Sequence, residues 1–326
     1  MSSKDKLLLV HKLRESDLDS IVPELSKFYQ LIIPSDYSRE NLIKLITDVQ
    51  VVLAGVVTGP MVEAARELKM IQTLGAGINH LDLEAISNTS IRIGNSHSNA
   101  MVVAEHGVAM MLALARKLAA HDAKMRTGQW FKPSGDETDL PWLSTGIHGK
   151  KLGIVGFGHI GKAVHKLLGG FDMDTLVFDR TKDHGGVKNV DLAQLLSQAD
   201  YIVVTIPLTA ATRNLISDAE FGMMNKTAIL VNISRGEVID KTALWNCLKN
   251  YPGISAGLDV WYPGDPGMDG FSEDHRFDKL DNLLMSPYRA ATLGGASPHL
   301  AGVIENLKNW ALKGELIHEV DSKEGY

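Results

Sequence analysis

Three spaced glycines followed by an acid form the pattern with the most definite chemistry in this chain. Residues 151–162 read KLGIVGFGHIGK, so Gly156, Gly158 and Gly161 follow an apolar run at the spacing GxGxxG. In such a loop the first glycine permits a tight turn, the second lets a pyrophosphate approach the backbone, and the third lets a helix pack on the strand. The N–H groups and the positive dipole end of that helix then face the phosphates. The pattern predicts a dinucleotide-binding loop.

The acid is Asp179, which closes a second apolar run, Leu176–Phe178, 18 residues after Gly161. A carboxylate at this place accepts hydrogen bonds from the ribose hydroxyls of adenosine and repels a 2′-phosphate. NAD is therefore favoured over NADP. Arg180, the next residue, keeps NADP open as the alternative, because a guanidinium at the same place would bind that phosphate.

Arg235 is the second candidate for binding chemistry. It lies in the run Ser234-Arg235-Gly236, directly after the apolar segment 228–233. A guanidinium is planar and can hold a carboxylate through two parallel hydrogen bonds. We therefore expect Arg235 to bind an acidic substrate. The alternative is an ordinary arginine on an exposed loop.

The elements that must position these residues alternate along the whole chain. Short apolar or β-branched runs are typical of buried strands, and the stretches between them carry apolar residues three and four apart, as amphipathic helices do. This alternation predicts parallel, doubly wound sheets. The expected strands are 7–10, 30–33, 51–54, 70–74, 91–93, 152–155, 175–178, 201–206, 228–233, 254–258 and 282–285.

Three segments interrupt this alternation. Residues 100–118 predict one long apolar helix with Asn99 as its N-cap. Residues 127–148, which include two prolines, predict a connecting loop. Residues 261–279 are rich in Pro, Gly and Asp and predict a second loop after a strand. Long loops of this kind often carry function.

Composition narrows the class of protein. The chain has 326 residues, a net charge of −6 and one cysteine, which favours two domains and argues against a general nucleic-acid binder, a disulfide scaffold and a cysteine metal cage. Cys247 shares a helical spacing with Leu244 and Leu248, so we expect a buried structural thiol. The longest apolar stretch, 108–115, is far shorter than a membrane span, and no His, Asp or Glu cluster has metal-ligand spacing. We expect a cytoplasmic protein with no metal, nucleic-acid or membrane partner.

With these motifs in this order, the chain resembles the NAD-dependent D-isomer-specific 2-hydroxyacid dehydrogenase family. The similarity extends over nearly the whole chain, and its form around 98–106 is closest to the formate dehydrogenases of the family. Besides the glycine loop and Asp179, the matching segments are 75–82 (GAGINHLD), 98–99 (SN) with 103–106 (VAEH), 206–212 (IPLTAAT), 232–236 (NISRG), 257–261 (GLDVW), and Asn306 with Gly314.

The resemblance implies an α/β fold of two Rossmann-like, doubly wound parallel-sheet domains. The substrate domain would be flavodoxin-like and discontinuous, with residues 1–100 and 288–326, and the NAD-binding domain, 101–287, would be inserted into it. The resemblance also implies a homodimer formed through the cofactor domain. The reaction would be hydride transfer between the nicotinamide and a small 2-oxo or 2-hydroxy acid.

Candidate site residues follow from the same resemblance. Arg235 would hold the carboxylate of the substrate, with the backbone of Ala76, Gly77 and Ile78 and the side chain of Asn99 assisting. The residues implied to bind the cofactor are Val103, Gly156, Gly158, His159, Ile160, Gly161, Asp179, Arg180, Pro207, Thr212, Ile233, Ser234, Arg235 and Asp259.

The acid–base pair is where the chain departs from the family's pattern. The family places its catalytic histidine after a proline, and here Pro287 is followed by Tyr288. The partner carboxylate lies about five residues after the aspartate of the Asp-Val-aromatic segment. That count reaches Gly264, and only a one-residue shift reaches Asp265. Tyrosine has an unperturbed pKa of about 10 and so is an acid rather than a base at neutral pH. We expect Tyr288 to be the proton donor.

Three functions remain open from the sequence. The first is a reductase of 2-oxo acids in which Tyr288 donates the proton, with His80, His97 and His299 as substitute donors. The second is a dehydrogenase whose reaction needs no proton transfer, as with formate. The third is a catalytically silent protein that binds NAD and acts as a regulator.

Overall fold

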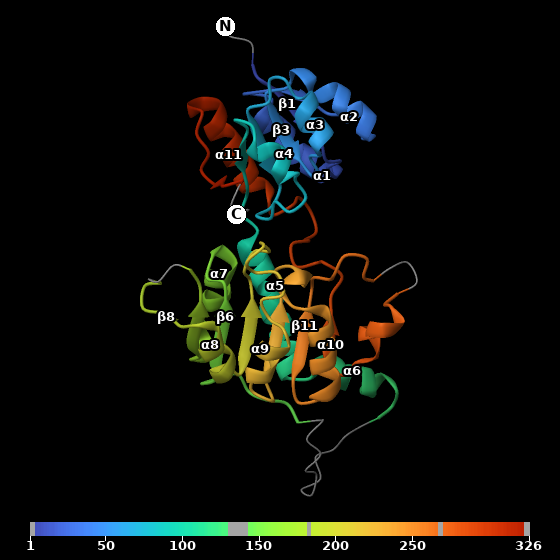
Figure 1. Cartoon of the computed structure of the whole chain (residues 1–326), viewed down its shortest axis with the longest axis vertical. Helices are drawn as coiled ribbons and strands as arrows, with labels where there is room; N and C mark the ends of the chain where they lie inside the picture. The colour runs from blue at the N-terminus through green and yellow to red at the C-terminus, as the bar shows by residue number, and fades with distance from the viewer. Residues whose placement is uncertain (1–3, 130–142, 181–183, 267–269, 323–326) are drawn as a thin grey trace, which may run out of the picture. The chain divides into compact units, whose positions relative to one another are not determined.

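The computed structural model describes residues 4–129, 143–180, 184–266 and 270–322. The chain forms two compact units (Figure 1), the first from residues 1–99 and 291–326 and the second from residues 100–290. That the second unit binds the cofactor and the first the substrate stays a prediction.

The first unit is a six-stranded sheet whose strands follow the order β13-β5-β4-β3-β1-β2. Every pair is parallel except β13 with β5, which is antiparallel. The order of the first five strands is that of a flavodoxin-like doubly wound sheet. The strands are β1 (Lys6–Leu9), β2 (Gln30–Ile32), β3 (Val51–Ala54), β4 (Met70–Thr73), β5 (Arg92–Gly94) and β13 (Glu319–Val320).

Helices cover both faces of this sheet, and its central strands are therefore buried on both sides. β3 and β4 are buried at all of their residues. One face packs against α1 and α11 through a cluster that includes Leu7, Ile21 and Leu307. The helices are α1 (Glu15–Leu25), α2 (Arg39–Leu45), α3 (Gly59–Ala64), α4 (Leu83–Ser87) and α11 (Leu300–Lys313), with a 3-10 turn at Ile46–Asp48.

The second unit is a seven-stranded sheet with the order β12-β11-β10-β9-β6-β7-β8, parallel throughout. This is the dinucleotide-binding order, in which the chain reverses direction across the sheet between β6 and β9. The strands are β6 (Lys151–Val155), β7 (Asp174–Phe178), β8 (Lys188–Asn189), β9 (Tyr201–Val204), β10 (Ile229–Asn232), β11 (Ser255–Leu258) and β12 (Leu283–Met285).

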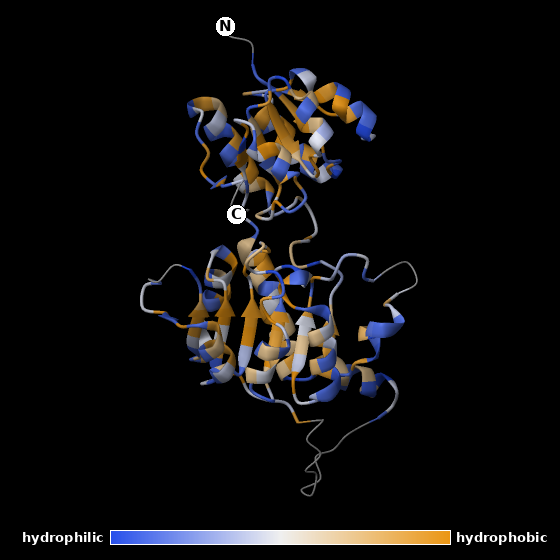
Figure 2. Ribbon diagram, in the orientation of Figure 1, coloured by the Kyte–Doolittle hydropathy of each residue, from blue (hydrophilic) through white to orange (hydrophobic). Residues whose placement is uncertain are grey.

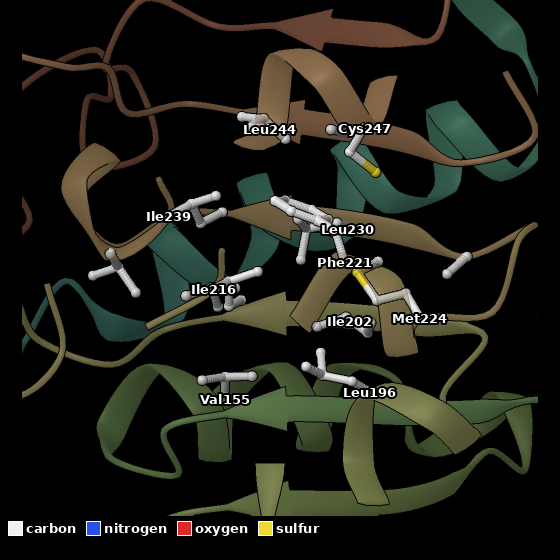
Figure 3. Packing of buried hydrophobic residues seen from close by; sticks show 14 of the residues in the cluster. Val155, Leu196, Ile202, Ile216, Phe221, Met224, Leu230, Ile239, Leu244 and Cys247 are labelled. Atoms are coloured by element: carbon white, nitrogen blue, oxygen red, sulfur yellow. The ribbon is translucent and has the colours of Figure 1, made fainter. Parts of the chain in front are cut away.

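Six helices belong to the second unit within its described residues: α5 (Ala100–Ala115), α6 (Leu118–Arg126), α7 (His159–Leu167), α8 (Leu192–Gln198), α9 (Asp218–Met223) and α10 (Lys241–Asn250). Figure 2 shows the central strands of both sheets as mostly apolar and the helices as mixed. Figure 3 shows Ile202 and Leu230 of adjacent strands in one buried apolar cluster with Phe221 of α9 and with Leu244 and Cys247 of α10. Cys247 is 3% exposed, and burial raises the pKa of its thiol to about 11. The predicted buried structural thiol is therefore confirmed.

The predicted fold class is confirmed, whereas some predicted boundaries are wrong. The helix expected over 100–118 ends at Ala115, because Lys117 adopts a left-handed backbone with φ 50° before α6 begins. β8 and β13 have two residues each and were not predicted. Of the expected loop 127–148, residues 130–142 lie outside the described residues, as do 267–269 of the loop 261–279. The latter loop contains 3-10 turns at Glu273–His275 and Phe277–Lys279.

Candidate functional site

The glycine loop joins β6 to α7 at the point where the strand order reverses. A Cβ at Gly156, whose φ is 92°, would lie 2.8 Å from backbone atoms of Ile206, and a Cβ at Gly161 would lie 2.3 Å from the carbonyl oxygen of Gly156. Both positions therefore require glycine. A Cβ at Gly158 would meet no atom within 4 Å, so this glycine leaves open space in front of the first turn of α7. The loop fits the pyrophosphate of a dinucleotide.

Asp179 is held beside this loop directly after β7. Its Oδ2 accepts a hydrogen bond from the N–H of Phe157 at 2.8 Å, and Nδ2 of Asn189 donates to its carbonyl oxygen at 3.1 Å. The buried ring of His184 places Nε2 3.6 Å from Oδ1 of Asp179. Arg180 is exposed. The acid therefore lies next to the glycine loop, as binding of an adenosine ribose requires.

The other residues implied to bind the cofactor lie at the ends of neighbouring strands or in the helix that packs on them. Oγ1 of Thr212 donates to the carbonyl oxygen of Pro207 at 2.6 Å, which closes the loop after β9. Val103 of α5 and Ile233 after β10 are both 5% exposed. Thr212 thus holds the loop after β9, whereas Val103 and Ile233 are buried in the interior.

Arg235 follows β10, and the side-chain amide of Asn232 holds the backbone around it. Asn232 accepts a hydrogen bond from the N–H of Ser234 at 3.0 Å and donates to the carbonyl oxygen of Arg235 at 2.9 Å. A Cβ at Gly236 would lie 2.3 Å from the carbonyl oxygen of Trp261, so glycine is required where the next loop crosses. The guanidinium donates to the carbonyl oxygen of Ser234 at 2.7 Å. No carboxylate of the described residues lies within ion-pair distance of it.

A pocket of about 440 Å³ opens beside Arg235 within the second unit. It lies at the carboxyl ends of β10, β11 and β12, the edge at which parallel α/β sheets bind ligands. Its walls carry one guanidinium, two carboxylates and two phenols. The lining residues are Arg235, Gly236, Glu237, Val260, Trp261, Tyr262, Pro263, Asp265, Pro266, Pro287 and Tyr288.

The sequence left Gly264 and Asp265 as the two positions for the partner carboxylate. Of these, Asp265 lines this pocket. Pro263 and Gly264 occupy the two central places of a turn closed by a 2.9 Å hydrogen bond from the N–H of Asp265 to the carbonyl oxygen of Tyr262. Gly264 has φ 84°, as the third residue of a type II turn requires. The Asp265 side chain is 8% exposed and forms an ion pair with Lys241 at the start of α10. The Pro-Gly pair was the sequence signal for this shift.

Tyr288 lines the same pocket from the segment after β12. Its side chain is exposed, at 60%, and its backbone is left-handed with φ 58°. Such a conformation is uncommon for a bulky residue and is found more often at functional sites. The structure thus brings Arg235, Asp265 and Tyr288, which are far apart in the sequence, to one pocket.

The residues implied to assist in substrate binding lie in the first unit. Nδ2 of Asn95 donates to the carbonyl oxygen of Ala76 at 3.0 Å, Ile78 is 1% exposed, and Asn99 is 7% exposed. Gly77 lies between Ala76 and Ile78 on the loop after β4. These contacts give the loop a defined conformation.

Two of the substitute donors also have defined surroundings in the first unit. The ring of His299 lies against Gly75, and its buried Nδ1 has no hydrogen-bond partner among the described residues. Burial lowers the pKa of His299. His97 packs edge-on against the ring of His318, with centroids 5.1 Å apart. His299 is therefore a neutral, packed histidine near pH 7.

Residues 108–290 match the family model described as the NAD binding domain of D-isomer specific 2-hydroxyacid dehydrogenases. The chain belongs to this family. Membership makes it a 2-hydroxyacid dehydrogenase-like oxidoreductase with a nicotinamide cofactor, and it confirms the resemblance inferred from the motifs.

Relatives within the family are similar over most of this chain. A glyoxylate reductase of Thermococcus litoralis is 31% identical, with 96% of this chain and 95% of the relative covered. A D-3-phosphoglycerate dehydrogenase of Methanocaldococcus jannaschii is 30% identical over 97% of this chain, but the chain covers 59% of that longer protein. The solved structure of a 2-hydroxyacid dehydrogenase from Ketogulonicigenium vulgare Y25 is 26% identical, with a TM-score of 0.77 and 98% and 99% of the two chains covered.

Among the helices of the described residues, none has the length and apolarity that crossing a bilayer requires.

Proposed function

We propose that the protein reduces a small 2-oxo acid, or oxidises the matching 2-hydroxy acid, with Arg235 holding the carboxylate and Tyr288 exchanging the proton. One observation supports this most strongly. Arg235 and Tyr288 line one pocket, and the guanidinium has no carboxylate partner among the described residues. An uncompensated guanidinium in a pocket is suited to a carboxylate ligand.

When bound, the dinucleotide supplies or accepts the hydride. The side chains of this protein do the rest. Arg235 would orient the substrate through its carboxylate, and Oη of Tyr288 would give its proton to the carbonyl oxygen during reduction and take it back during oxidation. Ala76, Gly77, Ile78 and Asn99 of the first unit stay the residues that the family resemblance implies to assist in substrate binding.

The preferred cofactor in this proposal is NAD. The Asp179 carboxylate beside the glycine loop supports it, because a 2′-phosphate would meet a negative charge there. The exposed Arg180 supports NADP as the alternative.

The assembly in this proposal is a homodimer formed through the cofactor domain. No residue of α6 is buried, and Leu118 and Met125 on this helix are 57% and 49% exposed. Apolar side chains on such a helix are suited to covering by a second copy. A cytoplasmic location belongs to the proposal as well, supported by the single free thiol of Cys247.

The test is a screen of purified protein with NADH and with NADPH against glyoxylate, pyruvate, hydroxypyruvate and bulkier 2-oxo acids, and with NAD⁺ against formate. We expect reduction of at least one 2-oxo acid, with a higher kcat/KM for NADH. Tight NADH binding without turnover of any 2-oxo acid would overturn the proposal in favour of a silent NAD-binding protein. Oxidation of formate alone would favour the reaction without proton transfer.

The variant that tests the role of Arg235 is Arg235→Met, which keeps a long unbranched side chain and removes its charge. Hydrogen bonds to charged groups contribute about 1.5–3 kcal/mol, so kcat/KM for the 2-oxo acid should fall by about 10- to 100-fold. Arg235 is also among the residues implied to bind the cofactor, so the Kd of NADH is measured as well, and it should change less than kcat/KM does. Arg126→Met, which removes an exposed guanidinium paired with Asp122 outside the pocket, is the control.

A further inference from the structure

A histidine, a serine and an aspartate form a continuous polar chain inside the second unit. Asp259 follows β11, Ser286 follows β12, and His106 lies on α5. Oγ of Ser286 is 2.5 Å from Oδ1 of Asp259 and 3.0 Å from Nε2 of His106. Asp259 is 3% exposed, whereas 30% of the His106 side chain is exposed. The chain therefore runs from a partly exposed ring to a buried carboxyl group.

Asp259 at the end of this chain holds the backbone of Tyr288 and of the two residues after it. Its Oδ1 accepts a hydrogen bond from the N–H of Arg289 at 2.7 Å, and its Oδ2 accepts one from the N–H of Ala290 at 2.8 Å. Its carbonyl oxygen accepts the N–H of Tyr288 at 2.9 Å. One residue thus binds three successive amides, the first of which belongs to the left-handed Tyr288.

Donor and acceptor chemistry determines the direction of the chain. In its carboxylate form Asp259 only accepts hydrogen bonds, so the single hydrogen of the Ser286 hydroxyl goes to Oδ1. The hydroxyl oxygen then accepts from its other neighbour, and Nε2 of His106 must carry a hydrogen. Removing that hydrogen, or the hydroxyl, leaves the buried carboxylate with fewer donors and loosens its hold on residues 289 and 290, which follow Tyr288 directly.

We infer that His106 is a positioning residue for the proposed proton donor: through Ser286 it orients Asp259, and Asp259 fixes the backbone that presents Tyr288 to the pocket. The inference rests on the proposed function, since it gives a role to the backbone of the donor. His106 contributes no side chain to the pocket itself. Its effect passes through the two hydrogen bonds of Ser286 and through its own Nε2, which lies 3.5 Å from Oδ1 of Asp259.

The kinetic test compares two disabling variants with two conservative ones. Ser286→Ala and His106→Leu remove the bridging hydroxyl and the ring donor, and both should lower kcat for the 2-oxo acid by about 10- to 100-fold, because a small displacement of a reacting group costs rate of this order. KM should stay within about threefold, since Arg235 is untouched. Ser286→Thr and His106→Gln, which keep a hydroxyl and an N–H donor, should restore most of kcat.

The control is His165→Leu on α7. His165 also binds a hydroxyl, that of Thr175 at 3.2 Å, but it belongs to no chain that ends near Tyr288. The inference is overturned if Ser286→Ala and His106→Leu keep the wild-type kcat, or if the conservative variants are as slow as the disabling ones. It is equally overturned if only the thermal stability falls.

A second measurement needs no turnover, so it separates failure of this inference from failure of the proposed function. Amide hydrogen exchange at Tyr288, Arg289 and Ala290 should accelerate in Ser286→Ala relative to His165→Leu. In the wild-type protein, nitrogen NMR should show His106 with its hydrogen on Nε2. Unchanged exchange, or a neutral His106 ring protonated on Nδ1 alone, would overturn the inference even if the protein reduces a 2-oxo acid.

Discussion

Tyr288 is the proposed proton donor, and a variant that lacks only its hydroxyl oxygen tests this role. A free tyrosine titrates at a pKa of about 10, so its hydroxyl is better suited to giving a proton during reduction than to taking one at neutral pH. Tyr288→Phe keeps the ring and removes Oη. It should lower kcat for 2-oxo acid reduction by about 100-fold, with the Kd of NADH unchanged. Steady-state kinetics and NADH fluorescence check this.

The control is Tyr251→Phe, at an exposed tyrosine outside the pocket. A Tyr288→Phe variant as fast as that control would place the proton donor elsewhere.

His299 supplies a second test at the residue scale, through pH. Burial lowers its pKa in the folded state, so the unfolded chain binds the proton more readily. The stability associated with the neutral ring is therefore present above the unfolded pKa of about 6.5 and is lost as pH falls through the folded pKa. The urea midpoint of the wild type should fall between pH 7.5 and pH 5, and His299→Gln should reduce that fall. An equal fall in both proteins would contradict the assignment.

At the scale of elements, the turn at 262–265 is joined to α10 by one ion pair. Lys241 in the first turn of α10 pairs with Asp265, and their side chains are 28% and 8% exposed. Lys241→Met leaves a buried carboxylate without its partner. The free energy of unfolding should fall by about 2 kcal/mol, less than the ~3–5 of a fully buried pair, because Lys241 is partly exposed. Adding Asp265→Asn should recover part of the loss in urea denaturation. Lys69→Met, which breaks the exposed pair with Asp5, should cost less than about 1 kcal/mol. Equal losses in Lys241→Met and Lys69→Met would contradict the argument.

At the scale of the whole molecule, the proposed homodimer predicts a mass twice the 35.5 kDa of one chain. Light scattering after size-exclusion chromatography measures this directly. Replacing Leu118 and Met125 of α6 together with glutamate should return the mass to that of one chain, since buried unpaired charges disfavour an interface. Leu312→Glu, at a residue of α11 that is 68% exposed, should leave the dimer intact. A wild-type mass of one chain would contradict the proposed assembly.

The sequence alone was sufficient wherever the cause is local. Apolar runs placed eleven of the thirteen strands that the described residues form, because a strand buried on both faces needs continuous apolar residues. The glycines at 156 and 161 were predictable for a similar reason, since backbone atoms approach too closely there for any side chain. The identity of Cys247 as a buried thiol followed from its helical spacing with leucines.

Tertiary structure decided what depends on residues far apart in the chain. Counting along the sequence could not show that Asp265 lines the same pocket as Arg235 and Tyr288. The apolar pattern over 100–118 would have continued the helix, but the left-handed backbone of Lys117 follows its end at Ala115. The short β13 was formed by pairing with β5, which no local pattern signals. The strand order brings β10, β11 and β12 side by side, and only this order joins Arg235 to Tyr288 in one pocket and His106 to Asp259 through Ser286.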